Sequence, residues 1–273
     1  MLDKTLNIRG TLTSLATPLV MGILNITPDS FSDGGKWNHL DEALRHTEAM
    51  IADGADIIDI GGESTRPGHT PVSAEEEAQR VLPVIEAVRK RFDIPISVDT
   101  FKSSVAESAI QAGADLVNDI WGLKYDSEMG AVIAKYDAAC CLMHNKSNTE
   151  YNNFLIDMLS ETQECVNLAR KAGIKDEKII LDPGVGFGKT FEMNLETMNH
   201  LELFKDLGFP VLLGTSRKSM IGLALDLPVD QRVEGTLATS VIGVIKGCSF
   251  VRVHDVKENR RVIQMTEAIL GCN

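Results

Sequence analysis

Side chains that can bind a polar or charged ligand recur at one kind of position in this sequence, directly after or beside a short apolar run. The residues in such positions are Asn25, Asp59, Asp99, Asn118, Asp119, His144, Asp182, Thr215, Ser216, Arg217, Lys218, Arg252 and His254. Strand termination or capping of the next helix would explain some of them, and we expect it for Asp119, Ser216 and Asp59. Capping does not explain a polar group at every run. It also does not explain Arg252, because a cation is unfavourable at a helix N-terminus. The pattern therefore predicts one shared binding site.

The apolar runs that precede these residues are rich in Val, Ile and Leu without polar alternation, as in parallel strands buried on both faces. They span Leu19–Ile26, Asp56–Ile60, Ile96–Val98, Leu116–Val117, Ala138–Met143, Ile179–Leu181, Val211–Leu213 and Phe250–Val253. Helical patterns lie between them, including a capping box at Ser73–Glu76 and a helix stop at Gly173. Eight strand–helix units predict an α/β fold, the (β/α)8 TIM barrel, with its site at the carboxyl ends of the strands.

No linker or change in composition divides the 273 residues. A TIM barrel uses about 250 residues as one domain, so we expect a single domain over residues 1–273. The barrel should begin at about residue 19. Residues 1–18 are then an extra N-terminal segment, which we interpret as a hairpin covering the bottom of the barrel.

Two loops combine Gly and Pro with hydroxyl groups: residues 25–35 after the first run and residues 61–68 after the second. They could be ordinary solvated turns, but beside a barrel mouth they suit a mobile lid that binds an anion. A third Gly-rich segment, Gly184–Lys189, lacks the spacing of a phosphate-binding P-loop. We interpret its glycines as allowing the backbone to approach a flat ligand.

The formal net charge is −12 at pH 7, which disfavours binding to nucleic acid or to an anionic membrane. An anionic substrate would then require positive charge gathered at the site itself. The five cysteines are odd in number and none is spaced Cys-x-x-Cys, which is typical of a reducing compartment. No apolar stretch has the length of a signal peptide core or a membrane span, so we expect a cytoplasmic protein.

Taken together, these motifs resemble the dihydropteroate synthase family. The resemblance rests mainly on the two loop motifs, Met21–Gly35 and Gly61–Gly68. Shorter motifs follow in the same order, at Ser97–Thr100, Asn118–Ile120, Leu142–His144, Leu181–Lys189, Gly214–Ser219 and Val251–Asp255. The match covers nearly the whole chain. It departs after His144, where Asn145-Lys-Ser stands in place of the Met-Arg-Gly of many members, so the role of that loop stays open.

The resemblance implies a transferase of folate biosynthesis. It condenses 6-hydroxymethyl-7,8-dihydropterin pyrophosphate with p-aminobenzoate, giving 7,8-dihydropteroate and pyrophosphate, with Mg²⁺ as cofactor. The reaction we expect is dissociative: pyrophosphate leaves, and the neutral amine then attacks a pterin-methyl cation. Such a reaction needs no Ser, Cys or His nucleophile.

The resemblance also implies roles for residues of the mouth. Asp99, Lys218 and Arg252 would be catalytic. The pterin would be bound by Asp99, Asn118, Asp182, Lys218 and Arg252. Pyrophosphate would be bound by Thr65, Arg66, Arg252 and His254, with Asn25 on the Mg²⁺. The p-aminobenzoate pocket would contain Phe31, Pro67, Phe187 and Ser219.

Two other functions share part of this residue set. A methyltransferase that passes a methyl group from methyltetrahydrofolate to a corrinoid protein would use Asp99, Asn118 and Asp182, but would not need the Thr-Arg-Pro-Gly loop, Lys218 or the Arg-x-His pair. A non-catalytic pterin-binding protein is disfavoured because Asn25 and the phosphate-binding groups are all present.

The resemblance also implies a homodimer, formed through helices of the later units.

Overall fold

The computed structural model describes residues 5–26, 36–63 and 71–271, and its strands form a parallel barrel. Neighbouring strands follow the order β8-β7-β6-β5-β4-β3-β10-β9. The two ends of this row meet through a parallel bridge between Leu181 and Val211. The barrel strands are β3 (Leu19–Asn25), β4 (Ile57–Gly61), β5 (Ile96–Asp99), β6 (Leu116–Asp119), β7 (Ala139–Met143), β8 (Ile179–Asp182), β9 (Leu212–Leu213) and β10 (Phe250–Val253). The predicted TIM barrel is confirmed.

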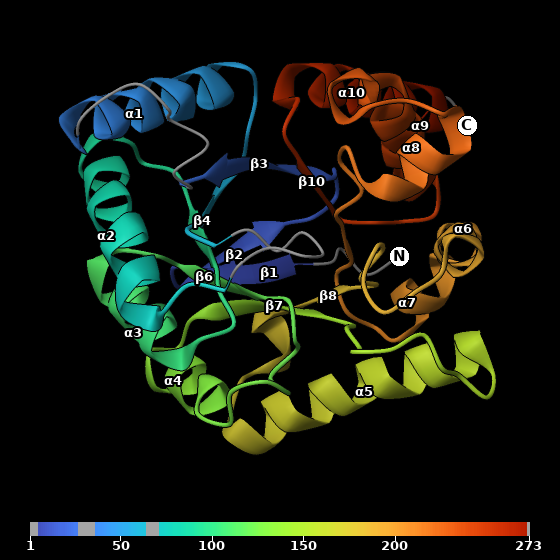
Figure 1. Cartoon of the computed structure of the whole chain (residues 1–273), viewed down its shortest axis with the longest axis horizontal. Helices are drawn as coiled ribbons and strands as arrows, with labels where there is room; N and C mark the ends of the chain where they lie inside the picture. Colours follow the sequence, from blue (N-terminus) through green and yellow to red (C-terminus); the bar gives the residue numbers. More distant parts are fainter. Residues whose placement is uncertain (1–4, 27–35, 64–70, 272–273) are drawn as a thin grey trace.

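Helices surround the strands as a ring (Figure 1). They are α1 (Lys36–Ala52), α2 (Ala74–Arg91), α3 (Ser103–Ala112), α4 (Met129–Lys135), α5 (Phe154–Ala172), α6 (Phe191–Asn199), α7 (Glu202–Asp206), α8 (Ser219–Leu225), α9 (Val233–Ile245) and α10 (Val256–Leu270). Short 3-10 turns lie at η2 (Asp176–Lys178) and η3 (Val229–Gln231). The Ser73 hydroxyl accepts a hydrogen bond from the amide of Glu76 at the start of α2, as expected. Helix α5 ends at Gly173, whose φ of 92° is in the left-handed region.

A hairpin precedes the barrel, formed by β1 (Thr5–Ile8) and β2 (Thr11–Ser14) in antiparallel register. Leu6 and Ile8 are buried, and they share one apolar cluster with Ile57 and Leu116, which begin β4 and β6. Because strands start at the N-terminal end of a parallel barrel, the hairpin closes that end. In Figure 1 it lies at the centre of the helical ring. The expected hairpin at the barrel bottom is confirmed.

Alternation along the strands determines which side chains reach the mouth. Ile57, Leu116, Ile180 and Phe250 belong to the interior cluster that the hairpin closes. Residues two positions further on point to the same side of a strand. Those residues are Asp59, Asn118, Asp182 and Arg252, and they lie nearer the carboxyl end. The interior is thus apolar at the bottom and polar towards the mouth.

Candidate functional site

The polar layer at the mouth begins on four adjacent strands, β3 to β6. Register pairs Asn25 with Gly61, Gly61 with Asp99, and Asp99 with Asn118. Gly61 has no side chain, and a Cβ built on it would lie 3.8 Å from both Asn25 Oδ1 and Asp99 Oδ2. Asn25 and Asp99 therefore direct oxygen atoms into the space that a side chain at residue 61 would occupy.

Arg252 is held between two buried carboxylates. Its Nε donates to Asp59 Oδ2 at 2.6 Å, and its Nη2 donates to Asp99 Oδ2 at 2.6 Å. Asp59 is completely inaccessible to solvent. Our interpretation of Asp59 as a strand terminator or helix cap is wrong, because its carboxylate lies inside the barrel and pairs with Arg252. The signal for this was its position two residues after Ile57, on the interior side of the strand.

This ion pairing sets the charge state of the layer. Burial raises the pKa of Asp99 to about 7, with the negative charge of Asp59 adding to the effect and Arg252 opposing it. The same two carboxylates raise the pKa of Arg252, so the guanidinium stays charged. Asp99 Oδ1 and Asp59 Oδ1 are buried and have no hydrogen-bond partner among the described residues. Asp99 thus retains an acceptor that a ligand or a water molecule can use.

Asp182 and Lys218 form the opposite side of the layer. Asp182 Oδ1 accepts the amide hydrogen of Gly184 at 2.7 Å. A Cβ on Gly214 would lie 3.6 Å from Asp182 Oδ2 and 3.9 Å from Lys218 Nζ, so these two groups face each other across Gly214. Burial raises the pKa of Asp182 and lowers that of Lys218 to about 8. Lys218 Nζ also lies 4.7 Å from the centre of the Phe187 ring, which places a cation over an aromatic face beside the carboxylate.

The segment after β9 carries further predicted residues. Ser216 Oγ lies 2.9 Å from His254 Nδ1 and accepts the His254 amide hydrogen at 3.1 Å. Ser216 therefore fixes His254. The expectation that Ser216 caps the next helix is wrong, because α8 begins at Ser219 with Lys218 at its N-cap position. Arg217 Nε donates to Asp255 at 3.0 Å, so its charge is paired beside the mouth. Ser219 is the first residue of α8 and is exposed.

Asp119 behaves as a turn residue, as expected. Its carboxylate accepts the amide hydrogens of Trp121 at 2.9 Å and Leu123 at 2.7 Å. The predicted contacts of Thr65, Arg66, Pro67 and Phe31 lie outside the described residues, as do the two lid loops.

Two of the glycines after β8 are required by close contacts within the chain itself. A Cβ on Gly184 would lie 1.9 Å from the carbonyl oxygen of His144, and a Cβ on Gly188 would lie 2.7 Å from that of Lys146. Both glycines have positive φ angles, 66° and 54°. They let the segment approach the loop after β7, so the close contact that they allow is between two parts of the chain.

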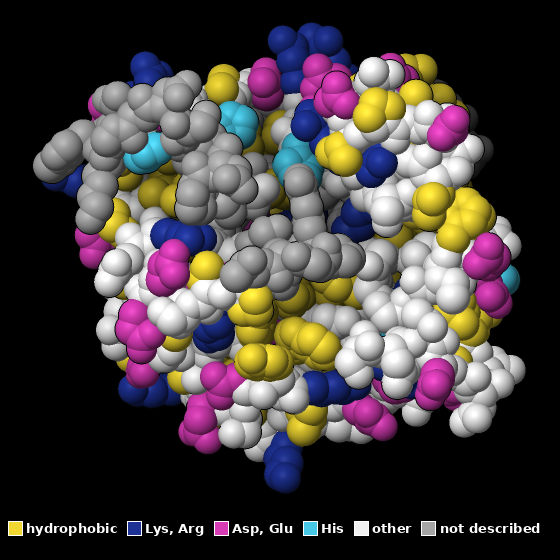
Figure 2. All heavy atoms as spheres, in the orientation of Figure 1, with side chains coloured by type: hydrophobic (Ala, Val, Ile, Leu, Met, Phe, Trp, Pro, Cys, Tyr) yellow, Lys and Arg dark blue, Asp and Glu magenta, His cyan; other side chains and the backbone are white. Residues whose placement is uncertain are grey.

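The distribution of charge on the mouth face agrees with the need for local positive charge. Figure 2 shows Asp and Glu side chains mostly along the outer edge of this face, with several Lys and Arg side chains nearer its middle. On this face the negative side chains therefore lie mostly away from the site, where they weaken anion binding least.

Comparison with known proteins defines the class. The family model described as pterin binding enzyme matches residues 21–254, which include every barrel strand apart from the first two residues of β3. A dihydropteroate synthase from Clostridium beijerinckii is 64% identical over 252 residues, which is 92% of this chain and 94% of the relative.

Solved structures agree. A dihydropteroate synthase from Clostridium difficile, crystallised in the presence of pteroic acid, has a TM-score of 0.91 at 52% identity and covers 93% of this chain and 97% of its own. One from Xanthomonas albilineans with 4-aminobenzoic acid has a TM-score of 0.94 at 38% identity, covering 99% and 100%.

The chain therefore belongs to the pterin-binding enzymes, and it shares the fold of their solved structures. Within that family it is one of the dihydropteroate synthases, which are transferases. The corrinoid methyltransferase and the non-catalytic binding protein are thereby set aside.

The Asp59–Arg252–Asp99 arrangement makes a testable prediction about ionisation. Asp59→Asn removes a negative charge beside Asp99 and leaves Arg252 to pair with Asp99 alone. Both changes favour ionised Asp99, so its pKa should fall below about 7. NMR titration of ¹³C-labelled aspartate carboxyl groups measures this, with Asp99→Asn used to assign the signal.

Asp56→Asn is the matched control, because Asp56 lies just before β4, at the opposite end of the barrel, where it binds the amide of Val20. It should leave the pKa of Asp99 unchanged. An unchanged or raised pKa of Asp99 in Asp59→Asn would contradict the arrangement.

Proposed function

We propose that the mouth of this barrel binds 6-hydroxymethyl-7,8-dihydropterin pyrophosphate and p-aminobenzoate, and joins them to 7,8-dihydropteroate with release of pyrophosphate. The observation that supports this most directly is the convergence of Asp99, Asn118, Asp182, Lys218 and Arg252 on one layer of the barrel interior. Each of these side chains offers a hydrogen-bond type that a pterin ring can use.

The pterin ring would lie against Asp182 and Asn118. A pterin presents adjacent N–H donors, and an ionised carboxylate can accept two of them. Asp182 Oδ1 already accepts from Gly184, whereas Oδ2 faces Gly214. Asn118 is buried on β6, which β7 separates from the strand of Asp182, and its amide can both donate and accept hydrogen bonds. Lys218 would donate to the 4-oxo group, and the planar guanidinium of Arg252 would stack on the ring.

Arg252 and His254 would bind the pyrophosphate end. Arg252 lies near the end of β10 and His254 directly follows that strand, so the two residues occupy alternate positions at the mouth. Thr65 and Arg66 complete this proposed set from outside the described residues. Arg252 also contacts Asp99, so one cation would join the phosphate and ring parts of the site.

Asn25 would hold Mg²⁺. Its amide oxygen borders the open space at Gly61, and such an oxygen suits a hard cation. The described residues contain no group of three or more His, Cys, Asp or Glu side chains placed to hold a metal. The amide oxygen of Asn25 fits Mg²⁺ nevertheless, because this ion commonly takes one or two protein oxygens and completes its shell with water and substrate phosphates. When bound, the ion would neutralise negative charge on the departing pyrophosphate.

The proposed reaction breaks the C–O bond to pyrophosphate and leaves positive charge delocalised on the pterin-methyl group. Ionised Asp99, fixed by Arg252, would stabilise that charge. The neutral amine of p-aminobenzoate then forms the C–N bond and loses a proton. Phe187 and Ser219, on either side of Lys218, would contribute to the p-aminobenzoate pocket together with Phe31 and Pro67.

Asp182→Ala tests the pterin assignment. Two charge-assisted hydrogen bonds are worth about 1.5–3 kcal/mol each, and water replaces part of that. We expect kcat/KM to fall by a factor on the order of 10²–10⁴. Asp115→Asn is the control, because Asp115 is a largely buried carboxylate paired with Arg89 just before β6, far from the mouth. A folded Asp182→Ala enzyme with near-normal kinetics would remove the pterin assignment.

Asn25→Ala tests the Mg²⁺ assignment. The variant should need about tenfold more Mg²⁺ for half-maximal turnover, the equivalent of one lost ligand interaction of about 1.4 kcal/mol. Binding of a pterin that lacks pyrophosphate, measured by titration calorimetry, should be unchanged. Equal loss of affinity for both ligands would show that Asn25 acts on the ring or on folding.

We also propose that the enzyme is a homodimer. Helices α8, α9 and α10 expose large apolar side chains, including Leu223, Ile242, Ile245, Met265 and Ile269. An apolar surface of this kind on adjacent helices is typical of an interface between subunits. Light scattering should give a mass about twice the 29.8 kDa of one chain. Ile245→Glu should shift it towards one chain, whereas Leu12→Glu, equally exposed on the hairpin, should not. A monomeric wild type would overturn the proposal.

The proposed location is the cytoplasm. The described cysteines, Cys140, Cys141, Cys165 and Cys248, form no disulfide with one another, in keeping with a reducing compartment. Among the described helices, none is long and apolar enough to cross a membrane. Fractionation of cells with antibody detection tests the location.

A further inference from the structure

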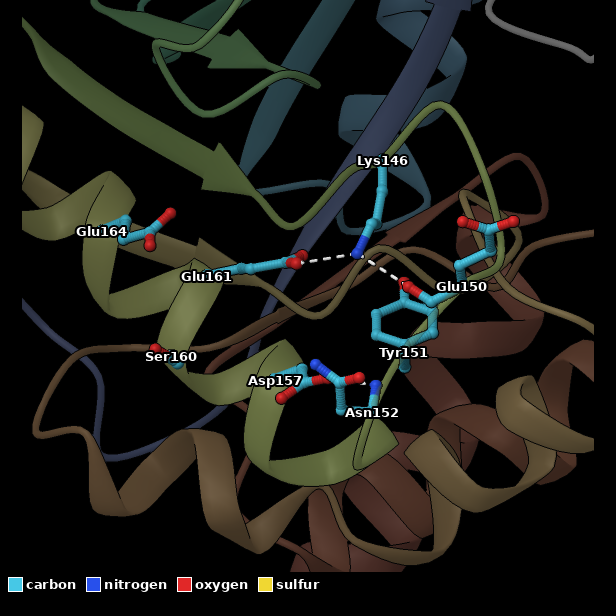
Figure 3. A pocket seen from close by; sticks show the side chains of 8 residues that line it. All are labelled: Lys146, Glu150, Tyr151, Asn152, Asp157, Ser160, Glu161 and Glu164. Atoms are coloured by element: carbon cyan, nitrogen blue, oxygen red, sulfur yellow. Dashed lines mark hydrogen bonds and ion pairs between the residues drawn. The ribbon is translucent and has the colours of Figure 1, made fainter.

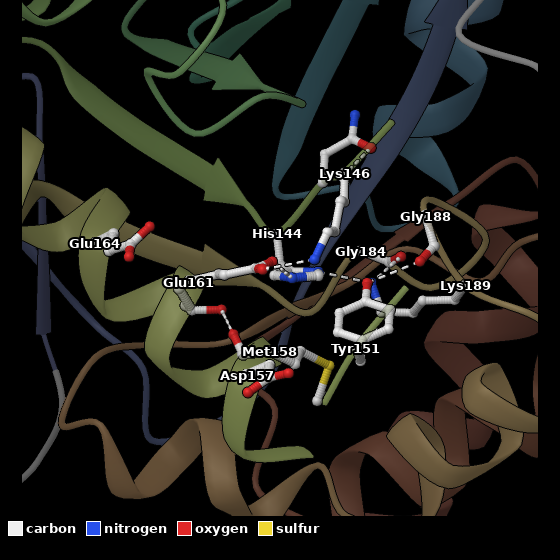
Figure 4. A network of polar contacts seen from close by, with 12 residues as sticks. His144, Lys146, Tyr151, Asp157, Met158, Glu161, Glu164, Gly184, Gly188 and Lys189 are labelled. Atoms are coloured by element: carbon white, nitrogen blue, oxygen red, sulfur yellow. Dashed lines mark hydrogen bonds and ion pairs between the residues drawn. The ribbon is translucent and has the colours of Figure 1, made fainter. Parts of the chain in front are cut away.

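A buried lysine lies directly behind the proposed substrate site. Lys189 ends the Gly-rich segment after β8, and its ammonium group has three hydrogen-bond acceptors around it (Figure 4). They are His144 Nδ1 at 2.8 Å, the carbonyl of Gly184 at 3.0 Å and the carbonyl of Phe187 at 3.1 Å. An ammonium group has three N–H donors, so this environment matches the charged form of Lys189. Burial opposes that form and lowers the pKa of Lys189 to about 7, while the negative charges of Asp182 and Glu161 act in the other direction.

His144 connects Lys189 to helix α5, which lies outside the barrel strands. Its Nε2 lies 2.9 Å from Glu161 Oε2 on α5. Because Nδ1 accepts from Lys189, the proton of the neutral ring must be on Nε2, where it is donated to Glu161. Burial and the charge of Lys189 lower the pKa of His144 to about 3, so the ring is neutral and holds this tautomer.

The loop after β7 completes the network from outside. Lys146 Nζ binds Glu161 Oε1 at 3.0 Å and the carbonyl of Glu150 at 2.8 Å. The Tyr151 hydroxyl donates to the carbonyl of Gly188 at 2.8 Å. These residues border an open pocket of about 470 Å³ between the loop and α5 (Figure 3). The segment Asn145–Ser147, whose role the sequence left open, thus helps to connect α5 with the Gly-rich segment.

The Gly-rich segment in turn contacts two residues of the proposed site, Asp182 and Lys218, and carries a third, Phe187. Its Gly184 amide holds the Asp182 carboxylate at 2.7 Å. Its Val185 carbonyl accepts from Lys218 Nζ, and its Phe187 ring lies 4.7 Å from the same Nζ. Movement of this segment would therefore displace the proposed pterin carboxylate, the proposed pterin lysine and one wall of the p-aminobenzoate pocket together.

We propose that Lys189 is a positioning residue for the condensation, which fixes the Gly184–Gly188 backbone through its two carbonyl contacts and is itself fixed by His144 and Glu161. The proposal rests on the proposed roles of Asp182, Lys218 and Phe187. Lys189 itself contacts none of these side chains through a hydrogen bond in the described structure, so it acts through the backbone between them.

Lys189→Met tests this, because methionine keeps most of the side-chain length and removes all three donors. We expect KM for p-aminobenzoate to rise about tenfold or more and the affinity for a pterin to weaken, with a smaller fall in kcat. Lys178→Met is the matched control. Lys178 is equally buried just before β8 and binds Asp137 at the opposite end of the same strand. Lys178→Met should lower the melting temperature by about as much as Lys189→Met does. It should leave the KM values for p-aminobenzoate and for the pterin substrate within about twofold of wild type.

Tyr151→Phe removes one hydroxyl donor to Gly188 from a partly exposed side chain and gives a second variant if Lys189→Met does not fold. It should raise KM for p-aminobenzoate about two- to fivefold. His144→Gln, whose amide can replace both ring nitrogens, should lie nearer to wild type than His144→Leu.

Unchanged KM values in folded Lys189→Met, or the same change in Lys178→Met, would overturn the positioning role. If Lys189→Met does not fold, an unchanged KM for p-aminobenzoate in Tyr151→Phe would overturn the positioning role instead. The outcome is separable from the assignment of Asp182, because Asp182→Ala tests that assignment in a chain whose Lys189 contacts are intact.

Discussion

The mouth of this barrel depends on one buried interaction, the guanidinium of Arg252 held between the carboxylates of Asp59 and Asp99. Burying any of these charges alone would be strongly unfavourable. Together they offset most of the cost, and the group carries one net negative charge when both carboxylates are ionised. That charge lies beneath the position proposed for a developing cation. The arrangement therefore joins two requirements in one structure: it makes buried charges tolerable, and it leaves an acceptor on Asp99 directed at the ligand space.

The strand alternation explains why the sequence revealed so much of this arrangement. All eight predicted runs agree with the observed strands to within about one residue at the start, and the polar residues after them share the interior face because alternate side chains share a face. Asn25, Asp99, Asn118, Asp182 and Arg252 could be found by this rule and by family resemblance. Asp59 follows the same rule but lies one position before the end of its run, where a helix cap seemed sufficient.

Other contacts depend on the distance between segments, which the sequence does not carry. Lys189 and His144 are separated by 45 residues and meet only because β7 and β8 are neighbours. Without that information, Gly184 and Gly188 suggest contact with a flat ligand, whereas the structure shows them against the carbonyl groups of His144 and Lys146. The same is true of Ser216, which lies against His254 because β9 and β10 are adjacent.

The hairpin at the barrel bottom has a consequence for how the chain reaches this structure. Leu6 and Ile8 complete a cluster that also contains Leu212 and Phe250, from the last two strands of the barrel. The hairpin is synthesised before the barrel strands, and it cannot bury these apolar side chains until the last two strands of the barrel have been made. Contacts between such distant parts of a sequence slow folding, because a large loop must close before they form. Until then Leu6 and Ile8 stay exposed to solvent, which favours association between unfinished chains.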